Sequence, residues 1–234
     1  MRMIDSRIGQ VRALTVDEVL GRQLNDIEKK YAPPALYVMG GMGIPIPAPR
    51  VAIVGTREPS RAGIETAHML AECFAKKGVT VISGLAKGID TAAHSGAIEA
   101  GGKTIAVLGT PLDRSYPSQN ADLQHHISIY HLALSQFPLG HKVQRKDFIL
   151  RNRTMALLCD ASIIVEAGDS SGTLSQGWEA LRLGRHLFVW HSVFENRRLK
   201  WPTEMANYGA IEFSDPDSVM DVLPFADVLP ALLF

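Results

Sequence analysis

The residues of this sequence that are suited to bind a charged ligand occur mainly in short glycine turns. Glycine lets the backbone approach an anion closely, and a helix that starts after the turn offers unpaired N–H groups to a phosphate. Hydroxyl and cationic side chains in the same turns can supply further contacts. The turns are Gly55-Thr56-Arg57, Ser83-Gly84 followed by Lys87-Gly88, Gly109, and Ser171-Gly172-Thr173. Four such turns favour an anion-binding site over glycines that serve turn geometry alone.

A second candidate feature is the basic segment 141–154, which holds five Lys or Arg residues against one Asp. Phe148 lies between two groups of cations in this segment, with Arg145 and Lys146 before it and Arg151 and Arg153 after it. Cations for phosphates beside an aromatic face for a base suit a single-stranded nucleic acid. The residues concerned are Arg145, Lys146, Phe148, Arg151, Asn152 and Arg153. The charge pattern fits equally well a solvated helix start with Phe148 in the core.

The turns follow short apolar runs that alternate with helical stretches. The runs at 51–54, 79–82, 104–108, 162–165 and 186–189 are rich in β-branched residues, and helices are expected to begin near residues 62, 89, 121, 148 and 172. Continuously apolar runs are typical of parallel strands that are covered on both faces. The pattern predicts a doubly wound, mostly parallel α/β sheet that forms a single domain over residues 50–215. The glycine turns then lie together at its carboxyl edge.

The two ends of the chain are expected to extend this domain. Residues 1–49 form a lead-in, with a capping box at Thr15 and Glu18, apolar residues at helical spacing from Val16 to Ile27, a short strand near 33–38 and a Gly/Pro loop. Residues 216–234 form a C-terminal helix and an apolar tail. The tail packs on the domain or contacts a partner.

Composition excludes several classes of protein. Lys plus Arg number 24 and Asp plus Glu also 24, so binding of nucleic acid through bulk charge is excluded. We expect no signal peptide and no membrane span. Cys73 and Cys159 form no CxxC motif, which indicates reduced, buried thiols in a cytoplasmic protein. No dinucleotide fingerprint, P-loop or metal-ligand spacing occurs, so no cofactor or metal is expected.

Taken together, these motifs resemble the DprA/Smf family of DNA-processing proteins, a branch of the Rossmann-like domains that also include the LOG proteins. The resemblance covers about residues 30–215. It rests on motifs in family order: 51–57, 83–90, Ala93-His94, 101–109, Leu112-Asp113, Tyr116-Pro117, Asn120, Phe148, Arg151-Asn152-Arg153, 165–167, Ser171-Gly172-Thr173 and Gly184-Arg185.

The resemblance implies a protein that binds and protects single-stranded DNA and helps to load a RecA-type recombinase in transformation or recombination. It implies a phosphate pocket lined by Arg57, Arg145 and Lys146, with Phe148 as a stacking face. It also implies a homodimer formed through the Rossmann-like domain. The full candidate set for DNA or phosphate binding is Gly55, Thr56, Arg57, Ser83, Gly84, Lys87, Gly88, Arg145, Lys146, Phe148, Arg151, Asn152, Arg153, Ser171, Gly172 and Thr173.

Departures from the related patterns bear on the alternatives. LOG proteins hydrolyse nucleoside monophosphates with a glutamate where this chain has Gln176. Because an amide cannot stabilise an oxocarbenium-like centre as a carboxylate does, we expect no enzyme. A binding module for a nucleotide-derived signal is the alternative, and a phosphoribohydrolase is less favoured. Two further departures are Val189-Trp190-His191 in place of the family's V-P-G, and a basic stretch at 196–201 that has no family counterpart.

Three other polar residues have structural interpretations. Asp90 is expected to brace the glycine turn that precedes it, and His94 to make one hydrogen bond in helix packing. Glu166 is either a carboxylate of the pocket or the acceptor for Arg153.

Overall fold

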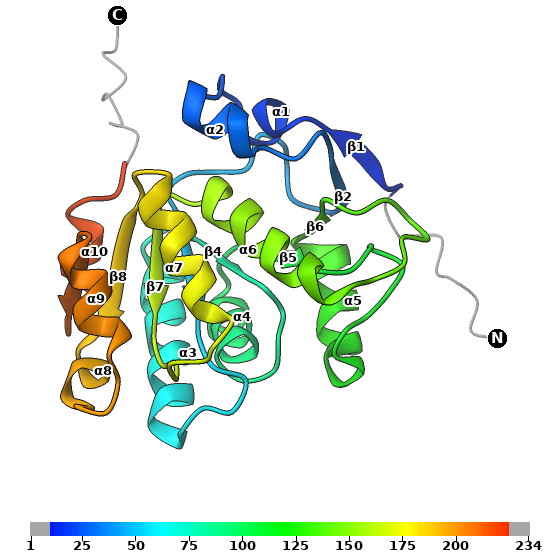
Figure 1. Ribbon diagram of the computed structural model, residues 1–234. Helices are drawn as coiled ribbons and strands as arrows, with labels where there is room; N and C mark the ends of the chain where they lie inside the picture. Colours follow the sequence, from blue (N-terminus) through cyan, green and yellow to red (C-terminus); the bar gives the residue numbers. More distant parts are fainter. Residues whose placement is uncertain (1–9, 225–234) are drawn as a thin grey trace, which may run out of the picture.

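The computed structural model describes residues 10–224, and over this range nine strands form one sheet (Figure 1). The pairs β1–β2 and β2–β6 are antiparallel, and all the other pairs are parallel. The strands are β1 (Arg12–Leu14), β2 (Leu36–Gly40), β3 (Arg50–Val54), β4 (Thr80–Ser83), β5 (Thr104–Leu108), β6 (Leu132–Ser135), β7 (Ala161–Ile164), β8 (His186–Trp190) and β9 (Ala210–Phe213). This arrangement confirms the expected mostly parallel α/β sheet.

The strand order is β1-β2-β6-β5-β4-β3-β7-β8-β9. The chain moves outward from β3 through β4 and β5 to β6, returns to place β7 beside β3, and continues to β9. The winding therefore reverses between β3 and β7. In such sheets a ligand site forms at the carboxyl ends of the strands where the order reverses.

Helices cover both faces of the sheet. One face packs on α3, α4, α5 and α10, and the other on α6, α7 and α9, with α1 and α2 beside α6 (Figure 1). The helices are α1 (Val16–Leu20), α2 (Asp26–Tyr31), α3 (Arg61–Lys76), α4 (Ile89–Glu99), α5 (Ala121–Tyr130), α6 (Arg145–Leu158), α7 (Thr173–Arg182), α8 (His191–Glu195), α9 (Trp201–Asn207) and α10 (Pro216–Met220), with a 3₁₀ turn η1 (Ser118–Asn120). None of the helices in the described range is long and apolar enough to cross a membrane.

The central strands are buried along their whole length. Every residue of β3, β4, β5, β6 and β7 is buried, as expected for strands that are covered on both faces. Arg50 at the start of β3 is the one charged residue among them. Its backbone N and its Nη2 donate to the Asp160 carboxylate, at 2.8 and 3.0 Å, which fastens the start of β3 to the start of β7.

The lead-in adds β1 and β2 to the edge of this same sheet. Its expected capping box is confirmed, since the Thr15 hydroxyl and the Glu18 carboxylate satisfy each other's backbone N–H groups. The expected single helix is wrong. It ends at Gly21, which has φ +69°, and a second helix, α2, starts with its own capping box at Asn25 and Glu28.

Glu28 attaches this lead-in to the main body of the protein. Its side chain is fully buried and accepts hydrogen bonds from Arg22, at 2.6 and 2.8 Å, and from Arg185. The hydrogen bond from Arg22 lowers the pKa of the Glu28 carboxyl to about 2. Because Arg185 precedes β8, this contact joins α2 to the opposite half of the sheet.

The two cysteines differ in their surroundings. Cys159 is buried as expected, whereas Cys73 is partly exposed, which corrects the expectation of two buried thiols. The C-terminal helix is α10, and most of the apolar tail, 225–234, lies outside the described residues.

Candidate functional site

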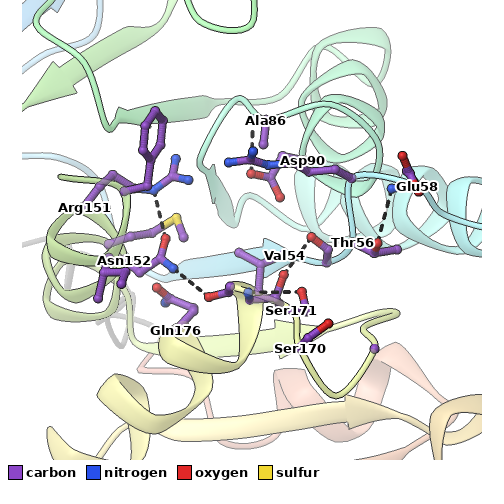
Figure 2. Close-up of a pocket in the computed structure, with 18 of the residues that line it drawn as sticks. Val54, Thr56, Glu58, Ala86, Asp90, Arg151, Asn152, Ser170, Ser171 and Gln176 are labelled. Atoms are coloured by element: carbon purple, nitrogen blue, oxygen red, sulfur yellow. Dashed lines mark hydrogen bonds between the residues drawn. The ribbon is translucent and has the colours of Figure 1, made fainter. Parts of the chain in front are cut away.

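A cleft of about 620 Å³ opens at the carboxyl ends of β3 and β7, where the strand order reverses. We call it the switch-point cleft. Its walls come from the turn after β3, the turn after β4, the start of α6 and the loop before α7. In Figure 2 the side chains of Thr56, Asn152 and Ser171 reach it from three different elements. The expected gathering of glycine turns at one edge of the sheet is thus present.

The turn after β3 is held on both sides by hydrogen bonds. The backbone N of Thr56 donates to the carbonyl oxygen of Glu166 at 2.7 Å, and the hydroxyl of Thr173 donates to the carbonyl oxygen of Gly55 at 2.8 Å. A Cβ atom at Gly55 would lie 2.9 Å from the Glu166 oxygen and would overlap Ile89. Gly55 is therefore required by close packing, and Arg57, which is exposed, is the charged group of this turn.

The turn after β4 contributes to an adjoining cavity of about 180 Å³, which we call the Lys87 cavity. Gly84 and Lys87 line it. Two predicted residues of this turn line neither cavity. Ser83 donates its hydroxyl to the Ile53 carbonyl oxygen at 2.6 Å inside the sheet, and Gly88, with φ +86°, starts α4 directly against the Thr56 carbonyl.

Arg151 supports both cavities from below. It is 6% exposed, and its Nη1 donates to the carbonyl oxygens of Gly84 and, at 2.8 Å, of Val107. Burial lowers the pKa of Arg151, and burial raises the pKa of its neighbour Asp90. Asp90 accepts from the backbone N of Ala86 at 3.2 Å, so its expected bracing of the turn is confirmed.

The basic segment divides around α6. Arg145, at the first position of the helix, is exposed and lines the switch-point cleft, while Lys146 is exposed but lines neither cavity. The expectation that Arg153 belongs to the binding site is wrong. Arg153 lies on the other side of the helix, where its Nη2 donates to Glu179 at 3.2 Å. Successive helical residues are rotated by about 100°, so residues two apart cannot share a face. The expected single cluster of five cations is therefore wrong.

Two aromatic rings border both cavities. Phe148 is half-buried, and its ring centroid lies 5.2 Å from that of Tyr116, which is 48% exposed. The Arg57 guanidinium lies 5.7 Å from the Phe148 ring centroid, at cation–π distance. Sequence reasoning placed Phe148 here but missed Tyr116 as a site residue. The Tyr116-Pro117 pair after the β5 turn was the available signal.

The loop before α7 completes the cleft. Asn152 donates from Nδ2 to the Gly172 carbonyl oxygen at 3.1 Å and to the Ser175 hydroxyl at 2.7 Å, which orients the loop that carries Ser171 and Thr173. A Cβ atom at Gly172 would meet no atom within 4 Å, so the backbone there is open to the cleft. Asn152 therefore positions this wall by bonding its backbone.

Gln176 and Glu166 both make hydrogen bonds that stabilise the fold in this region. Gln176 lines the cleft floor, is fully buried, and donates from Nε2 to the Ser162 hydroxyl at 3.0 Å. Glu166 accepts from the backbone N and the hydroxyl of Ser60, at 3.1 and 2.8 Å, and thereby holds the residue that caps the start of α3. It does not contact Arg153, so the second of the two interpretations of Glu166 is wrong. Among residues 10–224, no His, Cys, Asp and Glu side chains cluster in a metal-binding arrangement.

The charge at the mouth of the two cavities is positive. Arg57, Lys87 and Arg145 are exposed there, against the exposed carboxylate of Glu58 in the lining and that of Asp169 in the loop between Gly168 and Ser170. This local excess occurs in a chain with no net charge. Together with the two rings, it offers sites for phosphates and for a base.

Comparisons with known proteins agree with this geometry. The model of the family "DNA recombination-mediator protein A" matches residues 13–224. DNA processing protein DprA of Bacillus subtilis is 32% identical over 199 residues, which are 85% of this chain and 67% of that protein. This chain spans between 40% and 67% of the length of curated relatives it matches.

Two solved structures are similar over most of the chain. The X-ray structure of DNA processing protein A from Streptococcus pneumoniae has a TM-score of 0.77 at 30% identity, and the match covers 93% of this chain and 76% of that one. A structure of DNA processing protein A from Helicobacter pylori, which concerns the single-stranded DNA binding mode of that protein, has a TM-score of 0.74 at 25% identity and covers 91% and 95%.

Proposed function

Because this chain belongs to the DNA recombination-mediator protein A family, we propose that it binds single-stranded DNA in the switch-point cleft and the Lys87 cavity. The observation that carries the proposal is the pairing of three exposed cations, Arg57, Lys87 and Arg145, with the rings of Phe148 and Tyr116. Single-stranded DNA needs both kinds of contact, because its phosphates are charged and its bases are unstacked. The Helicobacter pylori relative, which is described by its single-stranded DNA binding mode, supports this assignment.

Each wall of the cleft then has a task in binding. Arg57, Lys87 and Arg145 neutralise phosphates, and the hydroxyl of Ser171 adds a hydrogen-bond donor opposite them. Phe148 and Tyr116 offer ring faces to a base. Phosphate contacts carry no sequence information, so binding is expected to be insensitive to base sequence.

We infer that Arg151 acts by holding the site in shape. Its Nη1 donors are taken by the carbonyl oxygens of Gly84 and Val107, and its Nε donates to Asn152. It joins the turn after β4 to β5 and to α6. Its role in binding is to fix the turns that carry the exposed cations.

The protein acts without catalysis in this proposal. Gln176 occupies the position of the LOG-type glutamate, and its amide nitrogen is bonded to Ser162. Incubation with nucleoside monophosphates and an assay for free base tests this point. Release of base would refute it, and tight binding of a small nucleotide without turnover would favour the sensor alternative.

We further propose a homodimer in the cytoplasm that presents DNA to a RecA-type recombinase. Two pockets on one strand would raise affinity through the high effective concentration of the second pocket. This part rests on the family alone. A monomeric mass in solution, measured by light scattering at the concentrations at which DNA binds, would refute the dimer.

The central test is a titration with oligo-dT at two salt concentrations. The log–log slope of affinity against salt is about −0.7 per neutralised phosphate on a single strand, so affinity falls steeply with salt. Arg57→Ala should weaken binding and make the slope shallower by about 0.7. Arg12→Ala, an exposed arginine on β1 at the far edge of the sheet, is the matched control and should bind as the wild type does. Absence of binding by the wild type at low salt would refute the proposal.

A further inference from the structure

A second large cleft lies beside the switch-point cleft, toward the end of β8. It measures about 780 Å³ and shares Thr56, Glu58 and Gly168 with its neighbour. Its other walls are the start of α3 and α8 with the loop that follows, which all lie at the same end of the sheet (Figure 1). We call it the β8 cleft. Because the two clefts share wall residues, a chain-like ligand bound in one can pass directly into the other.

Two neighbouring aromatic side chains, those of Trp190 and His191, line the β8 cleft. Trp190, at the end of β8, is partly exposed and packs edge-on against Phe213 with ring centroids 5.1 Å apart. The ring of His191 lies 4.9 Å from that of Trp190, and both residues line the cleft. A fixed indole ring at the wall of a cleft can stack a base.

A basic loop borders the same cleft. Arg197, Arg198 and Lys200 are exposed and form no ion pair with any residue of the range 10–224, while their neighbours Asn196 and Leu199 line the cleft. The backbone N of Lys200 donates to the Asp169 carboxylate at 3.2 Å, which ties this loop to the one that walls the switch-point cleft. Within the described range, three exposed cations that form no ion pair therefore lie in the loop that borders the cleft.

Several carboxylates lie in or near the cleft: Glu58 and Glu166 line it, Asp169 accepts from the backbone N of Lys200, and Glu195 lies 3.5 Å from Nδ1 of His191. Glu166 is occupied by its hydrogen bonds to Ser60 at the start of α3. Glu58 is exposed where the two clefts meet, and its negative charge disfavours a phosphate at that point. Bases are thus suited to the cleft interior and phosphates to the loop.

We propose that the β8 cleft is a second nucleotide subsite, which receives the single strand as it leaves the switch-point cleft. Trp190 and His191 stack a base, and Arg197, Arg198 and Lys200 bind the phosphates beside it. The inference rests on the proposed function, and it adds the path of the DNA strand. The strand runs from the Lys87 cavity, through the switch-point cleft, toward α8.

The test compares oligonucleotides of two lengths on the full chain. Arg197→Gln with Arg198→Gln removes two exposed charges, so the fold is expected to persist. The affinity for an oligo-dT of about 15 nucleotides should fall several-fold and its salt slope should become shallower by about 1.4, which is two phosphates at about 0.7 each. The affinity for an oligo-dT of about 4 nucleotides, which the first site holds alone, should be unchanged.

Lys29→Gln with Lys30→Gln on α2 is the matched control, since it removes the same charge at the opposite end of the molecule. It should leave both affinities unchanged. An unchanged affinity of the loop variant for the long oligonucleotide, or an equal loss for both lengths, would overturn the subsite. A wild type that binds neither oligonucleotide would instead refute the proposed function itself.

Trp190 provides a second readout. Trp190→Leu should weaken binding of the long oligonucleotide about five-fold or more, and Trp190→Phe should retain most of the affinity because a ring remains. Tryptophan fluorescence of the wild type should be quenched by the long oligonucleotide, and this quenching should be reduced in Trp190→Phe. Quenching of the same size in both proteins would place the base elsewhere and overturn the stacking role.

Discussion

Gly84→Ala is expected to destabilise the protein at the binding site, because the new methyl group displaces the side chain of Arg151. A Cβ atom at Gly84 would overlap the Arg151 guanidinium and lie 2.7 Å from its Nη2. Gly84 does not have a positive φ, so backbone strain is not involved and the whole effect is steric. The guanidinium must move and would lose its bonds to the carbonyl oxygens of Gly84 and Val107.

The expected loss follows from those two bonds. Hydrogen bonds to charged groups contribute about 1.5–3 kcal/mol each, so the free energy of unfolding should fall by about 3–6 kcal/mol. That is a large part of a total stability of about 5–15 kcal/mol. In urea, with a slope of about 1–3 kcal/mol per molar, the midpoint should fall by at least about 1 M.

Urea unfolding followed by circular dichroism measures this loss. Gly172→Ala is the matched control, since its Cβ would meet no atom within 4 Å and its φ is −60°. That variant should be as stable as the wild type or slightly more stable, because alanine restricts the unfolded chain. If the free energy of unfolding of Gly84→Ala lies within about 0.5 kcal/mol of that of the wild type, Arg151 does not hold the turns together as described above.

Three further outcomes are expected. The buried imidazole of His94 has a pKa lowered to about 3 because burial disfavours its charged form. Between about pH 6.5 and 3 the unfolded chain therefore binds more protons than the folded protein, so the free energy of unfolding falls as the pH falls through that window. His94→Gln should reduce this dependence on pH, measured by urea unfolding at pH 7 and at pH 5. Burial raises the pKa of the Cys159 thiol to about 11, so a thiol reagent at pH 8 should label the partly exposed Cys73 in the native protein and both thiols only after denaturation; native labelling of two thiols would contradict the buried position. Thr173→Val removes the hydrogen bond to Gly55, and should cost about 1 kcal/mol in thermal unfolding and weaken oligo-dT binding; unchanged binding would remove this contact from the site.

The sheet and its functional edge could be predicted because their signals are local. The runs that became β3, β5 and β7 are apolar at successive positions, and glycine turns follow β3, β4, β5 and β7. Such signals depend on a few neighbouring residues. Parallel strands then place all the turns on one edge whatever their order, so the location of the site follows from the topology.

The missed strands have weaker signals. β6 is four residues long and is followed by Gln136-Phe137-Pro138 with no glycine turn, so nothing in its sequence separates it from a buried loop. β1 is three residues long at the edge of the sheet, and the burial pattern of β9 is mixed. Pairing with neighbours that are distant in the sequence defines these strands, and a local pattern does not report it.

The roles of the arginines could not be read from their spacing. Arg151 and Arg153 belong to one short motif, yet one is a buried brace beneath the turns and the other contacts Glu179 on the far side of α6. The helical rotation separates the two side chains, but the face that meets the sheet is set by tertiary packing. Tyr116 was missed for the same reason, since its contact with Phe148 joins two loops.

The contacts that shape the cleft have a consequence for the order of folding. The hydrogen bond from Thr173 to Gly55 closes a separation of 118 residues, and that from Arg151 to Gly84 closes 67. Ordering segments that far apart costs chain entropy that no early local structure repays. The binding site therefore exists only once the turn after β3 and the loop before α7 have come together, and a half-folded chain has none. Ligand that binds only this state shifts the folding equilibrium toward it, so single-stranded DNA should raise the melting temperature by an amount that grows with the logarithm of its concentration.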